Sequence, residues 1–223
     1  TAPITAPPST PIRAQKNAVI KMSYGSLKNM LVAQNAFLDV SSGSFRGATN
    51  QRNWRERFKL ARKYLKDQEA HQKATAAGKK EKPPRKPVSD ETLKLVQKQI
   101  SLRISALTVS EMLNIIQLSR ELDFKVVITG AYESWVIAKQ IAEAEASVVL
   151  TPRRRRDPEF GAEERSGTWI ETPRVMEETG VPFAVTALTS SISLNGLAGR
   201  DLTSLPLEAA FLVRGGASER KAL

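Results

Sequence analysis

Short apolar segments alternate with longer amphipathic segments over the last 123 residues of this 223-residue chain. The apolar segments lie at 102–106, 125–129, 147–151 and 182–187. Segments with helical spacing of apolar residues lie at 109–122, 133–144, about 169–179 and 205–213. Strands that alternate with helices are typical of a parallel sheet covered by helices. We therefore expect an α/β fold with four parallel strands, in this spatial order, and with the helices outside.

Two architectures share this alternation, the open doubly wound sheet and the closed TIM-type barrel. No G-x-G-x-x-G motif follows any of the expected strands. The "VRGG" segment at 213–216 follows a helix, so it is not a dinucleotide-binding loop. The spacing of the strands suits either architecture.

The first hundred residues have a different character. The chain opens with "TAPITAPPSTPIR", whose prolines predict an irregular segment. Strands are expected at 17–22 and 36–41, with "SLKNMLV" as a short helix between them. A helix is expected over 50–77, with Trp54, Phe58, Ala61 and Leu65 on its buried side. After the basic "GKKEKPPRKP" loop, Ser89 should cap a helix over 90–100.

We accordingly divide the chain into residues 1–100, an irregular Pro-rich start with a basic helical region, and residues 101–223, a βα repeat. The first part carries 20 Lys and Arg against 7 Asp and Glu, and the second carries 14 against 16. Such asymmetry raises the question of nucleic-acid binding. The aromatic residues of the basic part suit a buried helix face better than a base-stacking surface, so the sequence favours a solvated helix and loop over nucleic acid.

The segments "VVLTPRRRR", "TWIETPRVMEETGVPFAV" and "DLTSLPLEAAFLVRGGASERKAL" follow one another between residues 148 and 223. In this order they resemble the C-terminal half of the barrel of the amidohydrolase superfamily, above all the imidazolonepropionase-like and related metal-dependent amidohydrolases. The resemblance covers residues 101–223 and, more weakly, the region back to "NAVIKM". It implies a partial or degenerate TIM-type (β/α) barrel.

The resemblance also implies a metal site. The family binds zinc or another divalent metal at the carboxyl ends of the barrel strands, through an H-x-H motif, two further histidines and an aspartate, and the metal-bound water attacks a C–N bond. The positions matching the later ligands are Ser105 or Leu107, Thr129 and Leu188. None of them is His or Asp, and no H-x-H motif is present. The sequence thus predicts no catalytic residue and no metal or other cofactor.

Composition supports the same expectation. The chain has no cysteine and one histidine, His71, which lies in a charged helical segment. A catalytic zinc site commonly needs three protein ligands. A carboxylate-only site for Mg²⁺ or Ca²⁺ is the alternative. However, the acidic residues after the third strand stand in a loop beside four arginines.

That arginine run, "RRRR", comprises Arg153, Arg154, Arg155 and Arg156. It directly follows a strand, so in a barrel it would lie on the functional face. It could bind an anion, together with Arg200 from the Gly- and Ser-rich segment 189–201. The alternative is a solvated loop that is neutralised by the acidic residues after it.

We therefore expect an amidohydrolase-like protein, related to hydrolases of non-peptide C–N bonds but catalytically impaired, with a role in ligand binding or as a scaffold. The alternatives are an active hydrolase completed by further strands or a partner, and a basic nucleic-acid-associated protein. A strand edge left open at 102–106 or its upstream neighbour should pair with a second copy or another chain, or be covered by the Pro-rich N-terminus and the 50–77 helix. No apolar run approaches a membrane span and no signal peptide is visible. The chain begins with Thr1, so we expect a processed chain or a piece of a longer one; the sequence leaves the compartment and the substrate open.

Overall fold

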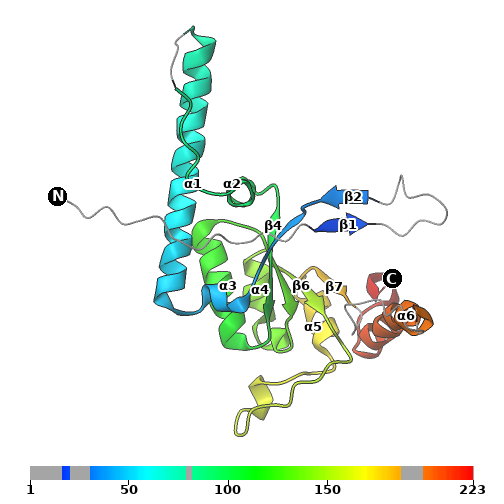
Figure 1. Ribbon diagram of the computed structural model, residues 1–223. Helices are drawn as coiled ribbons and strands as arrows, with labels where there is room; N and C mark the ends of the chain where they lie inside the picture. Colours follow the sequence, from blue (N-terminus) through cyan, green and yellow to red (C-terminus); the bar gives the residue numbers. More distant parts are fainter. Residues whose placement is uncertain (1–16, 21–30, 79–81, 187–197, 223) are drawn as a thin grey trace. The chain divides into compact units, whose positions relative to one another are not determined.

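The computed structural model describes residues 17–20, 31–78, 82–186 and 198–222. The chain forms two compact units (Figure 1). Unit 1 comprises Thr1–Leu102 and Leu122–Lys125, and unit 2 comprises Arg103–Glu121 and Val126–Leu223. The chain crosses from unit 1 to unit 2 within strand β4 (Ser101–Ala106). Among the described residues, no helix is both long enough and apolar enough to cross a membrane.

Unit 1 contains three short strands and two α-helices. Its elements are β1 (Ala18–Ile20), β2 (Leu31–Gln34), β3 (Phe37–Val40), the 3-10 helix η2 (Ser42–Phe45), α1 (Gly47–Ala76) and α2 (Asp90–Val96). Strands β1 and β2 pair antiparallel, with Val19 opposite Ala33. The expected short helix over 26–32 is therefore wrong at Leu31 and Val32, because backbone pairing with β1 holds these residues extended; residues 26–30 lie outside the described part.

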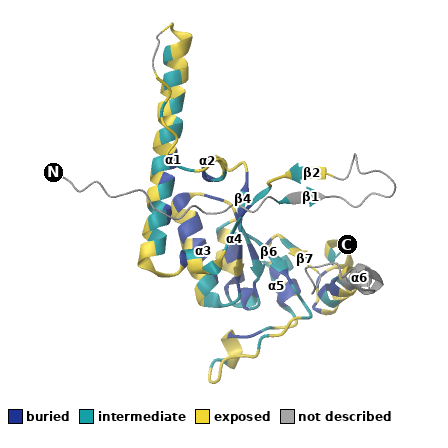
Figure 2. Ribbon diagram, in the orientation of Figure 1, coloured by how far each residue is buried: buried dark blue, intermediate teal, exposed yellow. Residues whose placement is uncertain are grey.

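The buried side of α1 carries the core of unit 1. Trp54, Phe58 and Ala61 are almost fully buried, as their helical spacing predicted, and Leu65 is half-buried. The far, C-terminal end of α1 is exposed or intermediate (Figure 2). The Phe45 ring stacks on Trp54 at 4.9 Å between ring centroids. Phe58 in turn packs against Phe124, at 5.4 Å. Aromatic burial of this kind therefore anchors the N-terminal half of the long helix.

Helix α2 begins as expected and ends early. The Ser89 hydroxyl accepts a hydrogen bond from the Thr92 backbone N–H, at 3.3 Å, which confirms the predicted cap. The helix stops at Val96 rather than at residue 100. Lys98 adopts a left-handed conformation (φ +57°), and the Gln99 N–H bonds back to the Lys94 carbonyl. This Schellman-type ending satisfies the last carbonyls and terminates the helix.

Unit 2 is the βα repeat that the sequence predicted. From the end of β4 it runs through α3 (Val109–Leu122), β5 (Val126–Gly130), η3 (Ser134–Ile137), α4 (Ala138–Glu143), β6 (Ser147–Leu150), η4 (Glu163–Arg165), α5 (Thr172–Glu178), β7 (Phe183–Val185), α6 (Ala198–Arg214) and α7 (Glu219–Ala222). The strands follow in the order β4-β5-β6-β7. Pairing of β5 with β6 and of β6 with β7 is parallel. The prediction of a parallel sheet with α-helical connections is confirmed.

Helix α4 begins at Ala138 rather than at residue 133, after the 3-10 helix η3, and two further helix boundaries in unit 2 differ from those expected. Helix α5 begins at Thr172 rather than near Trp169, with Pro173 at its start, where proline is favoured. Helix α6 begins at Ala198 rather than at residue 205, so the predicted loop 189–201 is wrong over 198–201. The helical pattern is weak there, because Gly199 and Pro206 both have low helix propensity. Residues 189–197 lie outside the described part.

One face of the unit 2 sheet is far more buried than the other. Ile104, Ile128 and Val148 are almost fully buried, and α3, α4 and α5 add further large buried side chains such as Met112, Ile141 and Met176. Successive strand residues point to opposite faces. The residues between the buried ones are exposed or half-buried, and we call their side the open face.

Among the described strands, the expected open edge falls on β3, the upstream neighbour of β4, and not on β4 itself. The order of the described strands is β3-β4-β5-β6-β7, so β4 has a neighbour on each side and its upstream neighbour β3 stands at the end. Association of another chain along this edge stays a prediction.

The first prediction concerns the aromatic core of unit 1. Phe58→Ala removes a side chain that is 0% exposed and contacts two other rings. We expect it to lower the free energy of unfolding by about 3 to 5 kcal/mol. Urea denaturation followed by circular dichroism measures the change. Lys59→Ala, at the exposed neighbouring position, is the control and should stay within about 0.5 kcal/mol of the parent; equal effects of the two changes would contradict this assignment of the core.

Candidate functional site

The ends of the strands on the open face are where the resemblance placed metal ligands. Thr129 pairs in register with Val149, and Val149 with Ala184, so these three side chains lie in one row on one face. Ser105 stands on the same face of β4, because its neighbours Ile104 and Ala106 are buried on the other. Ser105 is exposed and Thr129 half-buried. The structure thus brings two of the predicted positions together on one face.

The remaining predicted positions lie differently. Leu107 follows the end of β4 and closes over Gly130, where a Cβ would come within 2.7 Å of the Leu107 Cδ2 atom. Gly130 has φ +86°, which favours glycine as well. Leu188 lies outside the described residues. His71 is half-buried on α1 in unit 1.

The donor set of the row does not suit a metal ion. A neutral hydroxyl, a valine and an alanine cannot replace the histidine and carboxylate ligands that zinc sites use. Within the described part of the chain, no three His, Cys, Asp or Glu side chains stand close enough together to hold a metal ion. The described residues of the row therefore do not fit the metal that the resemblance implies.

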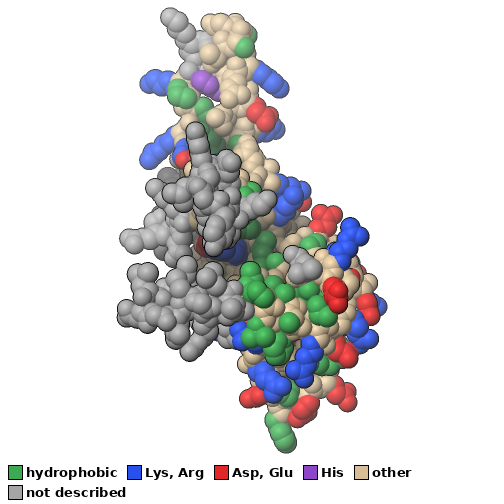
Figure 3. Space-filling model, turned by 90° about the vertical axis from the view of Figure 1, so that its right-hand side faces the viewer, with side chains coloured by type: hydrophobic (Ala, Val, Ile, Leu, Met, Phe, Trp, Pro, Cys, Tyr) green, Lys and Arg blue, Asp and Glu red, His purple; other side chains and the backbone are tan. Residues whose placement is uncertain are grey.

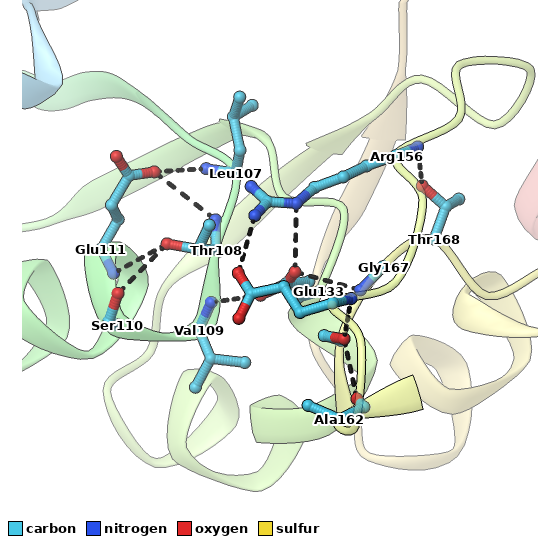
Figure 4. Close-up of polar contacts among 12 residues, drawn as sticks. Leu107, Thr108, Val109, Ser110, Glu111, Glu133, Arg156, Ala162, Gly167 and Thr168 are labelled. Carbon is cyan, nitrogen blue, oxygen red and sulfur yellow. Dashed lines mark hydrogen bonds and ion pairs between the residues drawn. The ribbon is translucent and has the colours of Figure 1, made fainter. Parts of the chain in front are cut away.

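A buried carboxylate orders the loops at the carboxyl ends of the strands. Glu133, after β5, is 3% exposed. It accepts hydrogen bonds from the Val109 N–H at 2.8 Å and from the Gly167 N–H at 3.0 Å (Figure 4). The Arg156 Nε atom lies 3.3 Å from the same carboxylate. One side chain thus joins the loops that follow β4, β5 and β6.

The loop after β6 is held by further contacts around Arg156. The Arg156 N–H donates to the Thr168 hydroxyl at 2.8 Å, and the Thr168 N–H donates to the Arg156 carbonyl at 3.0 Å. Gly167, which directly precedes Thr168, has φ +79°. A Cβ atom on Gly167 would lie 2.7 Å from the Pro158 nitrogen. Only glycine suits this position without movement of the backbone.

A second buried carboxylate holds the beginning of the arginine run. Glu208 on α6 is fully buried, and its Oε1 atom lies 2.6 Å from the Arg153 Nε atom. The Arg153 N–H is 3.4 Å from the other oxygen of the carboxylate. A buried carboxylate needs such partners, because an unpaired charge inside a protein is costly.

The four predicted arginines therefore fall into two pairs. Arg153 and Arg156, at the ends of the run, bind carboxylates of the protein itself. Arg154 and Arg155, in the middle, are exposed. The predicted neutralisation by following acidic residues is seen once, between Arg156 and Glu159 at 3.0 Å.

The other charged residues of this region contribute less. Glu163 receives a hydrogen bond from the Gly161 N–H, which lowers the pKa of its carboxyl. Arg200 lies in α6, and its side chain is outside the description. An anion site in this loop therefore rests on Arg154 and Arg155.

An apolar pocket adjoins the arginine run. Its lining residues come from the ends of β5 and β6, the segment before α5, the start of α5 and one position of α6: Gly130, Ala131, Tyr132, Leu150, Thr151, Pro152, Thr168, Trp169, Ile170, Thr172, Pro173 and Phe211. The Thr151 hydroxyl oxygen is buried without a hydrogen-bond partner among the described residues. The pocket is thus apolar and carries an unsatisfied polar group, as ligand pockets often do.

Sequence reasoning missed both buried carboxylates. Glu133 stands four residues beyond the expected strand 125–129, so a search of strand ends passed over it. Glu208 is a single acid between apolar residues in "LPLEAAF". A lone carboxylate on the buried side of a helix must find a cation, and that signal could have pointed to the arginine run.

Comparison with known proteins agrees with this architecture. No protein-family model matches the chain, and no curated protein matches it significantly. The crystal structure of an amidohydrolase from Thermotoga maritima MSB8 is similar, with a TM-score of 0.57 and 21% sequence identity. The similarity covers 93% of this chain and 54% of that structure. The fold of this chain is amidohydrolase-like.

The similarity extends over both units. At this identity it shows the fold alone, and the chain spans about half the length of the similar structure. The parallel sheet of unit 2 is consistent with part of a TIM-type barrel, as predicted.

The second prediction concerns the Glu133 carboxylate. Glu133→Gln keeps the shape of the side chain but removes the charge that faces Arg156, which is 28% exposed. Because Arg156 is partly solvated, we expect a loss of about 2 kcal/mol in the free energy of unfolding, below the 3 to 5 kcal/mol of a fully buried pair. Urea denaturation measures it, and Glu159→Gln, at an exposed partner of the same arginine, should cost less than about 1 kcal/mol. A smaller effect at Glu133 than at Glu159 would show that the loops do not depend on Glu133.

Proposed function

We propose that this chain is an amidohydrolase-like protein that has lost the metal-dependent hydrolysis of C–N bonds and binds a small organic acid. The observation that carries the proposal is the row on the open face of the sheet. Ser105 and Thr129 stand where the resemblance places histidines, and Val149 and Ala184 complete the row. Metal-assisted hydrolysis needs side chains that hold the metal and a base that moves protons. These four residues supply neither.

The chemistry that remains is binding. The pocket beside the arginine run offers three aromatic side chains, Tyr132, Trp169 and Phe211, and the unsatisfied Thr151 hydroxyl. Two exposed arginines follow Pro152, a lining residue, within three positions. An aromatic or cyclic acid suits this combination, because its ring can fill the apolar pocket and arginine binds carboxylates bidentately.

The alternative function is an active metal-dependent hydrolase in which further strands or a partner chain supply the ligands. The similar amidohydrolase is nearly twice as long as the matched region. This difference in length supports the alternative that further strands or a partner chain supply the ligands. The two candidates differ in the metal affinity expected for this chain on its own.

The third prediction tests the metal. After equilibration with Zn²⁺ and gel filtration, we expect elemental analysis to find no stoichiometric zinc on the parent chain. The triple variant Ser105→His, Leu107→His, Thr129→His should retain about one zinc per chain, because it places three imidazoles near the strand ends. A control with histidines at the exposed positions Lys94, Lys125 and Lys139 should retain none. About one tightly held zinc on the parent chain would overturn the proposal and favour the hydrolase.

The fourth prediction tests the pocket with benzoate as the probe. The indole N–H signals of the three tryptophans can be followed by ¹⁵N NMR. Benzoate should shift the signal of Trp169, which lines the pocket, and leave that of Trp54, in the core of unit 1, unchanged. Arg154→Gln with Arg155→Gln should weaken binding by roughly tenfold, the effect of losing one charge-assisted hydrogen bond of about 1.5 kcal/mol. No shift at millimolar benzoate, or an equal shift of Trp54, would contradict a site in this pocket.

A further inference from the structure

Helix α1 carries a second stripe of residues besides the buried one. It has 8 Lys and Arg against 3 Asp and Glu over 30 residues. Six of the basic residues, at successive spacings of 3, 4, 3, 4 and 7 positions, form one row that we call the cationic stripe: Arg52, Arg55, Lys59, Arg62, Lys66 and Lys73. Residues three and four apart lie on the same side of a helix. The stripe is therefore continuous along the helix except at Glu69, which occupies the same row.

The stripe lies apart from the buried side. At 100° per residue, Trp54, Phe58 and Ala61 centre about a third of a turn away from the stripe. Arg52, Lys59, Lys66 and Lys73 are exposed, and Figure 3 shows Lys and Arg side chains projecting from this helix in the upper part of the view. Arg62 has an additional structural contact, because its Nη2 atom donates to the Leu122 carbonyl at 2.8 Å. Beyond Leu65 no residue of α1 is buried.

From this geometry we propose that α1 binds the phosphate backbone of double-stranded nucleic acid, without sequence preference. From Arg52 to Lys73 the stripe extends about 32 Å, at 1.5 Å per residue. This is close to one turn of a B-form duplex, about 34 Å. Lys and Arg that neutralise phosphates release counterions, and this release drives binding. Lys82 and Arg85, on the segment that follows α1, add two positive charges to unit 1, whereas Lys86 forms an ion pair with Asp90 at 2.8 Å.

The neighbouring side chains favour a duplex over other anionic partners. α1 exposes no large hydrophobic side chain, whereas helices that bind membranes insert an apolar face. Protein interfaces likewise depend on buried apolar or aromatic anchors. Trp54 and Phe58 are buried in unit 1, so they offer no surface on which the bases of a single strand could stack. Phosphate contacts along a double helix need none of these groups.

The experiment compares two variants that lose the same charge. The stripe variant carries Arg52→Gln, Lys59→Gln, Lys66→Gln and Lys73→Gln. The control variant carries Lys94→Gln, Lys125→Gln, Lys139→Gln and Arg165→Gln, at exposed positions outside the stripe. Glutamine is a good helix former, so circular dichroism should show an unchanged helix content in both. Binding to a fluorescent duplex of random sequence and about 20 base pairs, twice the length of the stripe, is measured by anisotropy over a series of salt concentrations.

The parent chain should bind the duplex in low salt and lose affinity steeply as salt is added. The stripe variant should bind at least about tenfold more weakly, and the slope of log K against log salt should become less negative by about 3 to 4, near 0.9 for each lost phosphate contact. The control should stay within about threefold of the parent. The inference is overturned if the parent does not bind at micromolar concentration, or if both variants lose affinity equally. Tighter binding to single strands, or stripe-dependent binding to phosphatidylserine vesicles but not to the duplex, would also overturn it. None of these outcomes bears on the open face or the pocket of unit 2, so the two proposals fail separately.

Discussion

The loops of unit 2 depend on one buried carboxylate, that of Glu133. It accepts backbone N–H groups from the loop after β4 and the loop after β6, and it faces the Arg156 guanidinium. A buried carboxylate without these donors would be strongly destabilised, so the three loops must stay together for the charge to stay inside. Glu208 repeats the arrangement at the other end of the arginine run, through Arg153. Two internal acids thereby engage Arg153 and Arg156, while Arg154 and Arg155 are exposed.

This arrangement separates two properties that an active site normally combines. The loops at the carboxyl ends of the strands are well ordered by internal charge pairs. The row of side chains on the open face has no group that binds a metal or moves a proton. In barrel enzymes the chemistry comes from strand ends and loops on this side, while the sheet supplies stability. In this chain the described positions of the row carry Ser105, Thr129, Val149 and Ala184.

The longest element of unit 1 is the helix α1. Its N-terminal half is anchored by aromatic packing of Trp54 and Phe58, and its C-terminal half has no buried residue. A solvated helix of this length gains little from propensity alone. The basic residues of α1 are regularly spaced. The buried side does not account for this spacing, because its residues occupy other positions. Helix α1 therefore has two separate sets of residues, a buried side that packs in unit 1 and the cationic stripe.

The sequence by itself determined the periodic features. Alternation of strands and helices, the buried face of α1 and the Ser89 cap all follow from residues close together in the chain, whose spacing fixes which side of an element is apolar. The tertiary structure alone decided which distant charges meet. Arg153 pairs with a residue 55 positions away and Arg156 with one 23 positions before it, and no local pattern encodes such a choice. Local spacing governs the faces of elements, whereas the pairing of buried charges depends on which loops the assembled sheet brings together.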